Sequence, residues 1–159
     1  MAVGNTIIAS AEPKGPFWEG YVNGALKPGT VVQIDVSEGL GNDGWPDWEA
    51  FNQAADGSRH AIAVLLEDKL QGKPATSAYV SGDRCFVYFP QRGDMLNMLI
   101  GDVGGTGDSH AFGEILIVDD TTGELIATTG TPESECFQLL ETLAAPTADI
   151  LALCLFTGY

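Results

Sequence analysis

Short apolar runs separated by turn residues dominate the chain. They are rich in Val, Ile, Leu and aromatic residues, and Gly, Pro, Asp or Ser bounds them, which is typical of β-strands. The runs cover 31–36, 60–67, 84–89, 95–100, 114–119, 125–129 and 150–156. Residues 137–145 fit either a strand or a short helix, and Pro146 favours the shorter element, a strand. The pattern predicts an all-β fold, a small barrel or a sandwich.

Two pairs of runs are expected to form hairpins. Residues 78–80 and 84–89 flank the turn sequence Ser-Gly-Asp, and residues 114–119 and 125–129 flank Asp-Thr-Thr-Gly. In the second loop Gly123 comes late, where a positive φ is required.

Two regions do not follow the strand pattern. Residues 1–25 contain several Pro and Gly residues and predict an extended N-terminal arm, so that residues 26–159 form a single β domain. Residues 39–57 predict a long inserted loop, with one helical turn at 47–55 capped by Asp47.

Large aromatic side chains gather in these two irregular regions. Aromatic residues dominate interface energies, so we expect them to contact a partner or a second subunit, although they can also fold back over the barrel ends. The six residues are Phe17, Trp18, Tyr21, Trp45, Trp48 and Phe51.

Charge narrows the choice of partner. The formal net charge is −15, and all seven basic residues precede position 93, whereas eleven acidic residues follow it. Binding to phosphate backbones needs Lys and Arg, so we expect no nucleic-acid partner and no anionic membrane partner. No apolar run reaches the roughly 20 residues of a membrane helix, and the first residues lack the basic start of a signal peptide. We expect synthesis in the cytoplasm.

Catalytic signals are weak. Cys85 and Cys154 lie in apolar runs, which predicts buried thiols, and the three cysteines lack metal-ligand spacing. A hydrolase built from Cys136, His110 and Asp108 is conceivable, but nothing in their spacing singles them out. We therefore expect no enzyme activity and no catalytic residue.

Two acidic clusters allow weaker alternatives. Residues 42–49 and 119–124 bring oxygen ligands together as calcium sites do, but neither matches the EF-hand pattern. Trp45 and Trp48 beside acids also allow a sugar platform, and thus a carbohydrate-binding domain. We expect no metal and no cofactor.

Several segments resemble tailed-phage capsid decoration (cement) proteins. Residues 26–32, with the sequence LKPGTVV, and residues 61–68, AIAVLLED, resemble the opening strands of these small proteins. The match is closer at 93–99 (GDMLNML) and 113–119 (GEILIVD), and it continues through 141–145 and 154–157. The resemblance covers roughly residues 26–159, and the loop at 39–57 has no counterpart in it.

The resemblance implies a β-barrel or β-tulip-like domain, with a jelly-roll sandwich as the alternative fold. It implies a homotrimer at three-fold sites outside an icosahedral shell, with the major capsid protein as partner, a virion location, and stabilisation of the expanded shell. The N-terminal arm is expected to supply the grip, so that deleting residues 2–21 leaves a folded barrel. A tail or spike component of a virion is the related alternative.

Overall fold

The structure, a computed structural model, describes residues 6–9, 13–35, 37, 43–52, 62–101, 109–127, 135–145 and 150–158. Within these residues the regular elements are ten strands and one 3₁₀ helix, with no α-helix, and none of the described segments is a helix able to cross a membrane. The elements are β1 (Phe17–Val22), β2 (Val31–Ile34), β3 (Asp47–Ala50), β4 (Ala63–Leu65), η2 (Lys69–Gln71), β5 (Arg84–Tyr88), β6 (Met95–Ile100), β7 (Ile115–Val118), β8 (Leu125–Ala127), β9 (Glu135–Leu139) and β10 (Ile150–Phe156). The all-β prediction is confirmed.

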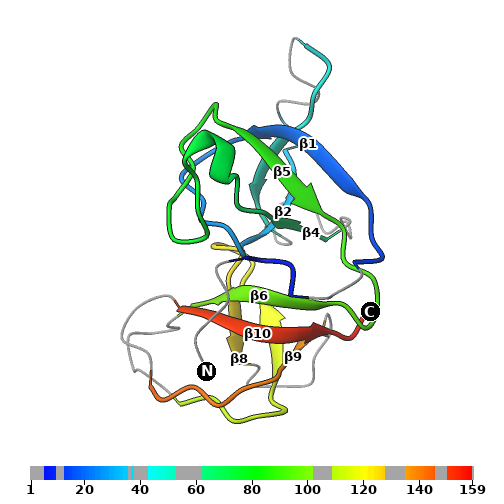
Figure 1. The fold of residues 1–159 in the computed structure, drawn as a ribbon, viewed down its shortest axis with the longest axis vertical. Coiled ribbons are helices and arrows are strands. Elements are labelled where there is room, and N and C mark those ends of the chain that lie inside the picture. The colour runs from blue at the N-terminus through cyan, green and yellow to red at the C-terminus, as the bar shows by residue number, and fades with distance from the viewer. Residues whose placement is uncertain are drawn as a thin grey trace.

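The strands form two closed barrels, one above the other along the long axis of the molecule (Figure 1). The first has the order β1-β3-β2-β4-β5, and the second has the order β10-β6-β8-β7-β9. Each barrel is thus built from consecutive strands, and the short connection between β5 and β6 joins the two. The small-barrel prediction holds, but the chain forms two such barrels rather than one barrel or a sandwich.

The first barrel closes unevenly around β1. This strand pairs with β5 in antiparallel fashion over five residues, from Phe17 opposite Tyr88 to Tyr21 opposite Arg84. On its other side it pairs with β3 in parallel over only two residues, Tyr21 and Val22. The first half of β1 therefore has a strand neighbour on one side only.

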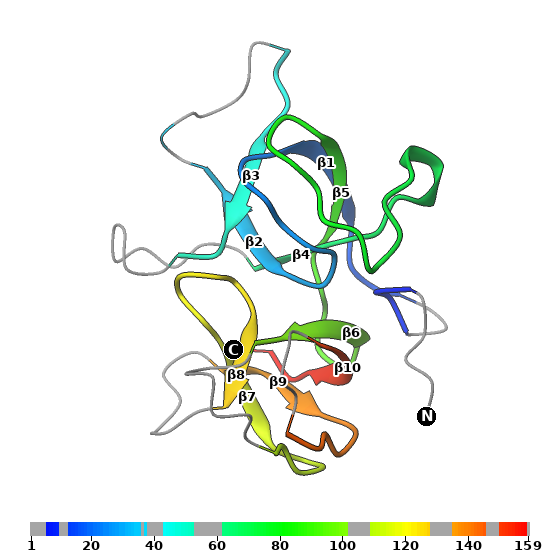
Figure 2. The same ribbon diagram turned by 90° about the vertical axis from the view of Figure 1, so that its left-hand side faces the viewer.

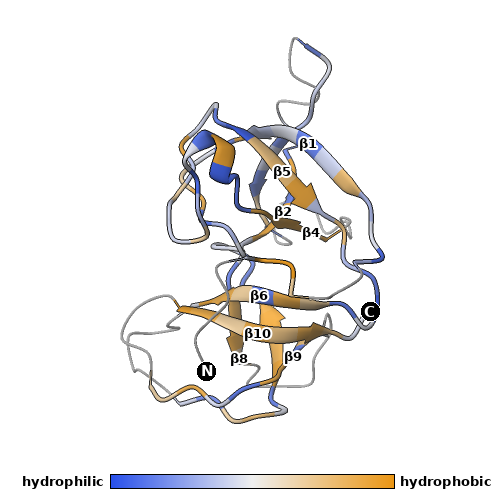
Figure 3. Ribbon diagram, viewed as in Figure 1, coloured by the Kyte–Doolittle hydropathy of each residue, from blue (hydrophilic) through white to orange (hydrophobic). Residues whose placement is uncertain are grey.

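The second barrel contains the longest ladder and the confirmed hairpin. β6 and β10 pair over six residues, and β7 pairs with β8 across the loop in which Gly123 has a φ of +71°. Most positions on these strands are hydrophobic (Figure 3). Cys154 on β10 is fully buried, and so is Cys85 in the first barrel, as predicted.

One hydrophobic cluster crosses the boundary between the barrels. It contains Val31 and Val64 from the first barrel together with Leu96, Leu116 and the inner residues of the second, all buried. A second cluster, around Trp48, fills the interior of the first barrel alone. Because a buried cluster is shared, the two barrels form one packed unit.

Main-chain contacts also join the barrels. The Gly29 carbonyl accepts a hydrogen bond of 3.1 Å from the Leu99 amide, and the Gly123 carbonyl accepts one of 2.8 Å from the Val31 amide. Both glycines have a positive φ, and a Cβ on Gly123 would lie 2.3 Å from the Val31 carbonyl oxygen. Glycine is required where two backbones approach this closely.

The segment 6–9 lies between the barrels, beside β6 (Figure 2). The Ile7 side chain is fully buried, its carbonyl accepts from the Asn97 amide at 2.7 Å, and its amide donates to a Glu67 carboxylate oxygen at 2.9 Å. Asn97 belongs to the second barrel, whereas Glu67 follows β4 of the first. Segment 6–9 is therefore an internal strap that contacts both barrels.

The structure corrects several predictions for the N-terminal half. Residues 17–22, assigned to a free arm, form β1, so deleting residues 2–21 would remove a barrel strand. Residues 47–50, expected in a helical turn of the insertion, form β3. Residues 78–80 form no strand, and β5 pairs with β1 and β4 instead of closing a local hairpin. Non-local pairing overrides the local turn signal here.

Candidate binding groove

Three large aromatic side chains are exposed on the first barrel. Phe17 is 52% exposed, Trp18 51% and Trp45 45%. They line a groove with a volume of about 530 Å³, together with Ile34, Pro46 and Phe86. We call this the aromatic groove. Exposed apolar surface of this kind typically marks an interaction site.

Local backbone chemistry explains why the groove opens where it does. The β1–β3 ladder contains a hydrogen bond of 3.0 Å from the Tyr21 amide to the Pro46 carbonyl and one of 2.7 Å from the Asn23 amide to the Trp48 carbonyl. The next position along β1 is Glu19, whose carbonyl would need a donor at Pro46. Proline has no N–H, so the ladder stops at this point.

The first half of β1 consequently presents unpaired backbone groups to the groove. The Phe89 amide donates to the Pro16 carbonyl and the Val22 amide to the Asp83 carbonyl, so the backbone amides and carbonyls of the even-numbered residues of β1 point towards β5. In an antiparallel ladder the backbone groups of the intervening residues point away from that partner strand. The amides and carbonyls of Phe17 and Glu19 therefore face the groove, and no described residue makes a hydrogen bond to them there.

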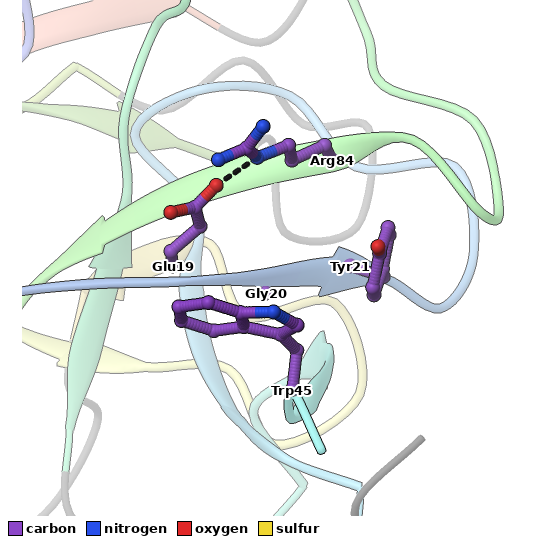
Figure 4. A pocket seen from close by; sticks show the side chains of 5 residues that line it. All are labelled: Glu19, Gly20, Tyr21, Trp45 and Arg84. Carbon is purple, nitrogen blue, oxygen red and sulfur yellow. Dashed lines mark ion pairs between the residues drawn. The ribbon is translucent and has the colours of Figure 1, made fainter. Parts of the chain in front are cut away.

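Polar side chains lie beside the groove, around a smaller pocket of about 140 Å³ (Figure 4). Glu19 on β1 forms an ion pair with Arg84 on β5, and the Trp45 indole lies on the other side of β1 from this pair. The Tyr21 hydroxyl donates to an Asp43 carboxylate oxygen at 2.6 Å. This hydrogen bond raises the pKa of Tyr21 and lowers the pKa of Asp43.

Trp48 and Phe51 do not belong to this surface. Trp48 is 1% exposed and Phe51 is 6% exposed, so both side chains lie in the core and are unavailable to a partner. Trp48 packs edge-on against Phe89, with ring centroids 5.9 Å apart, and Gly20 allows its close approach. The prediction of contact by these two residues, and of a Trp45–Trp48 sugar platform, is therefore wrong. Contact by the other four residues stays a prediction.

The other chemical candidates are only partly covered by the structure. His110 is buried, and its Nδ1 lies 3.4 Å from a Glu114 carboxylate oxygen. Asp108 and the Cys136 side chain lie outside the described residues, so the hydrolase arrangement is not tested. In the second acidic cluster, residues 119–124, one Asp119 carboxylate oxygen accepts hydrogen bonds from the Thr121 and Thr122 amides. Aspartate commonly stabilises turns in this way, so turn formation explains the presence of Asp119.

Sequence reasoning found the exposed aromatic residues but missed the rest of the groove. Ile34 and Phe86 were assigned to strands, and nothing in the sequence indicates that their side chains reach a shared surface. The local signal that was present is Pro46, which follows Trp45 and precedes β3 directly. A proline at the start of a strand marks the end of a ladder.

Comparison with known proteins identifies the fold. No protein-family model and no curated protein sequence matches the chain. Among solved structures, the chain is similar to the N base of head fiber gp8.5 of bacteriophage phi29, with a TM-score of 0.54 and 12% sequence identity. The match covers 91% of this chain and 95% of that chain. The likeness thus extends over nearly the whole of both molecules.

Proposed function

We propose that this protein is a structural component of a tailed-phage virion that binds the outer surface of the capsid. The observation that carries the proposal is the likeness in fold to the phi29 head fiber base over 91% of the chain. The decoration-protein resemblance of residues 26–159 points to the same class of protein independently. Both support the proposal of a protein attached to a phage head.

The exposed surface supports a binding role. Phe17, Trp18 and Trp45 together present an apolar area that a free monomer leaves in water, and aromatic residues are enriched at the centres of interfaces. The net charge of −15 favours a capsid surface with basic residues. We infer that the major capsid protein is the partner, and that the protein acts by binding and carries out no catalysis.

The finer proposal concerns assembly and effect. A homotrimer at a three-fold site would engage three equivalent capsid surfaces at once, and linked contacts convert weak binding into high avidity. A protein that binds only the expanded lattice stabilises that lattice, because binding shifts the equilibrium towards the bound state. The protein would thus reinforce a shell under load from packaged DNA.

Light scattering and co-pelleting test this proposal. The mass of the protein in solution is measured first. The protein is then sedimented with purified expanded shells and, separately, with unexpanded shells, both prepared without this protein. We expect a trimer that pellets with expanded shells only. Protein that stays in the supernatant with both shells would refute capsid binding, and a monomer that pellets would refute the trimer alone.

A further inference from the structure

β1 carries an unused strand edge inside the aromatic groove. Phe17 and Glu19 are two residues apart, so their amides and carbonyls repeat along the strand at roughly 6.6 Å. This is the repeat with which a neighbouring strand pairs. The edge is short because the β1–β3 ladder resumes at Tyr21.

We propose that the aromatic groove binds an extended, basic segment of the capsid protein, which pairs as a short strand with Phe17 and Glu19 of β1. This inference rests on the proposed function and names the part of the partner that is recognised. Addition of a strand to an exposed sheet edge is a general mode of peptide binding: main-chain hydrogen bonds supply affinity, and pockets for alternate side chains supply specificity.

The walls of the groove suit such a segment. Successive side chains of a bound strand would point to opposite faces, and the groove offers apolar surface on both. Trp18 lies on the face of its partner Val87, whereas Phe86 lies on the face of its partner Glu19. The volume of about 530 Å³ lies within the range of pockets that bury most of a small ligand. The aromatic residues therefore define positions for apolar side chains of the segment.

The charges around the groove define its other requirement. Glu19 lies on the half of β1 that β3 leaves unpaired, and Asp43 and Asp47 lie beside Tyr21. The one base near them is Arg84, so these four groups carry 1 − 3 = −2. Charge complementarity thus calls for Lys or Arg in the segment. A saccharide would use the aromatic faces but has no amide and carbonyl repeat to pair with β1, which is why we commit to a peptide.

A matched pair of variants tests the strand pairing. Glu19→Pro removes the amide that faces the groove, whereas Glu19→Ala keeps it, and both variants lose the ion pair with Arg84. Because the Glu19 amide does not bond to β5, the proline leaves the β1–β5 ladder complete. In co-pelleting with purified expanded shells, we expect Glu19→Pro to bind roughly tenfold more weakly than Glu19→Ala, the effect of one interfacial hydrogen bond.

Amide hydrogen exchange on the unmodified protein gives a second readout that does not depend on the folding of a variant. The Phe17 and Glu19 amides should exchange fast in free protein and more slowly on shells, while the already paired Tyr21 amide changes little.

The outcomes separate the two proposals. If the unmodified protein does not pellet, capsid binding fails and the inference falls with it. If it pellets, but both variants bind equally and exchange at Phe17 and Glu19 is unchanged, strand pairing is refuted and capsid binding stands. Tryptophan fluorescence that responds to soluble glycans and is unaffected by shells would also overturn the peptide assignment.

Discussion

Ile7 offers a direct test of how the two barrels are held together. Its side chain is fully buried in the cluster that both barrels share, and its backbone bonds to Asn97 of the second barrel and to the Glu67 carboxylate beside the first. If the strap 6–9 joins the barrels, Ile7→Ala should weaken the whole molecule and not one barrel.

The magnitude follows from the atoms removed. Truncation to Ala deletes about three carbon groups, each worth ~0.8 kcal/mol of burial, and the cavity that remains adds to this loss. We expect the free energy of unfolding to fall by about 3–4 kcal/mol, within the range for buried Ile or Leu to Ala. For a chain of this size the melting temperature should drop by roughly 10 °C. Ile8→Ala removes the same atoms from a partly buried side chain and should cost about 1 kcal/mol.

Guanidinium unfolding followed by two signals measures this effect. All three tryptophans, Trp18, Trp45 and Trp48, lie in the segments of the first barrel, so their fluorescence reports that barrel, while far-UV circular dichroism reports both. We expect one transition with coincident midpoints, shifted equally in Ile7→Ala. Equal losses in Ile7→Ala and Ile8→Ala, or a shift of the dichroism signal with unchanged fluorescence, would refute the strap.

Three further predictions concern backbone, hydrogen-bond and thiol chemistry. Gly123→Ala should destabilise the protein by several kcal/mol more than Gly72→Ala in thermal unfolding: both have a φ of +71°, but only Gly123 has a carbonyl oxygen 2.3 Å from the added Cβ. Tyr79→Phe should cost about 1–1.5 kcal/mol in the same assay, because the buried hydroxyl donates to the Leu66 carbonyl at 2.8 Å. Burial raises the pKa of Cys85 to about 12, so its thiol stays protonated at pH 8 and should resist alkylation until the protein is unfolded. Alkylation of Cys85 itself in the folded protein, located by peptide mapping, would contradict this.

The predictable part of the fold is the part encoded locally. The β7–β8 hairpin was expected because two β-branched runs flank a loop with glycine where φ is positive. β6 and β10 were expected because each is a continuous apolar run. Five of the six β6 residues are buried, so both of its faces are covered, and a strand covered on both faces has an uninterrupted apolar sequence. In these cases sequence and tertiary structure favour the same conformation.

The unpredicted part depends on pairing between distant residues. Proline and glycine around β1 indicate an arm, and this segment becomes a barrel strand because β5 pairs with it. β3 contains Asp47, Trp48 and Glu49, none of them β-branched, and becomes a strand because β2 pairs with it. The division into two barrels is likewise a property of pairing, which the spacing of apolar runs does not encode.

The candidate site shows the same limit at the level of single side chains. Trp45 and Trp48 lie three residues apart in one irregular stretch, yet one lines the groove and the other fills the barrel interior. Their difference follows from Pro46: β3 begins after it, so Trp48 points inward on a paired strand, whereas Trp45 remains beside the unpaired half of β1. The residue that ends the ladder therefore creates both the buried tryptophan and the open edge next to the exposed one, and a substitution of Pro46 that restored an N–H would be expected to close the groove by extending the β1–β3 pairing to Glu19.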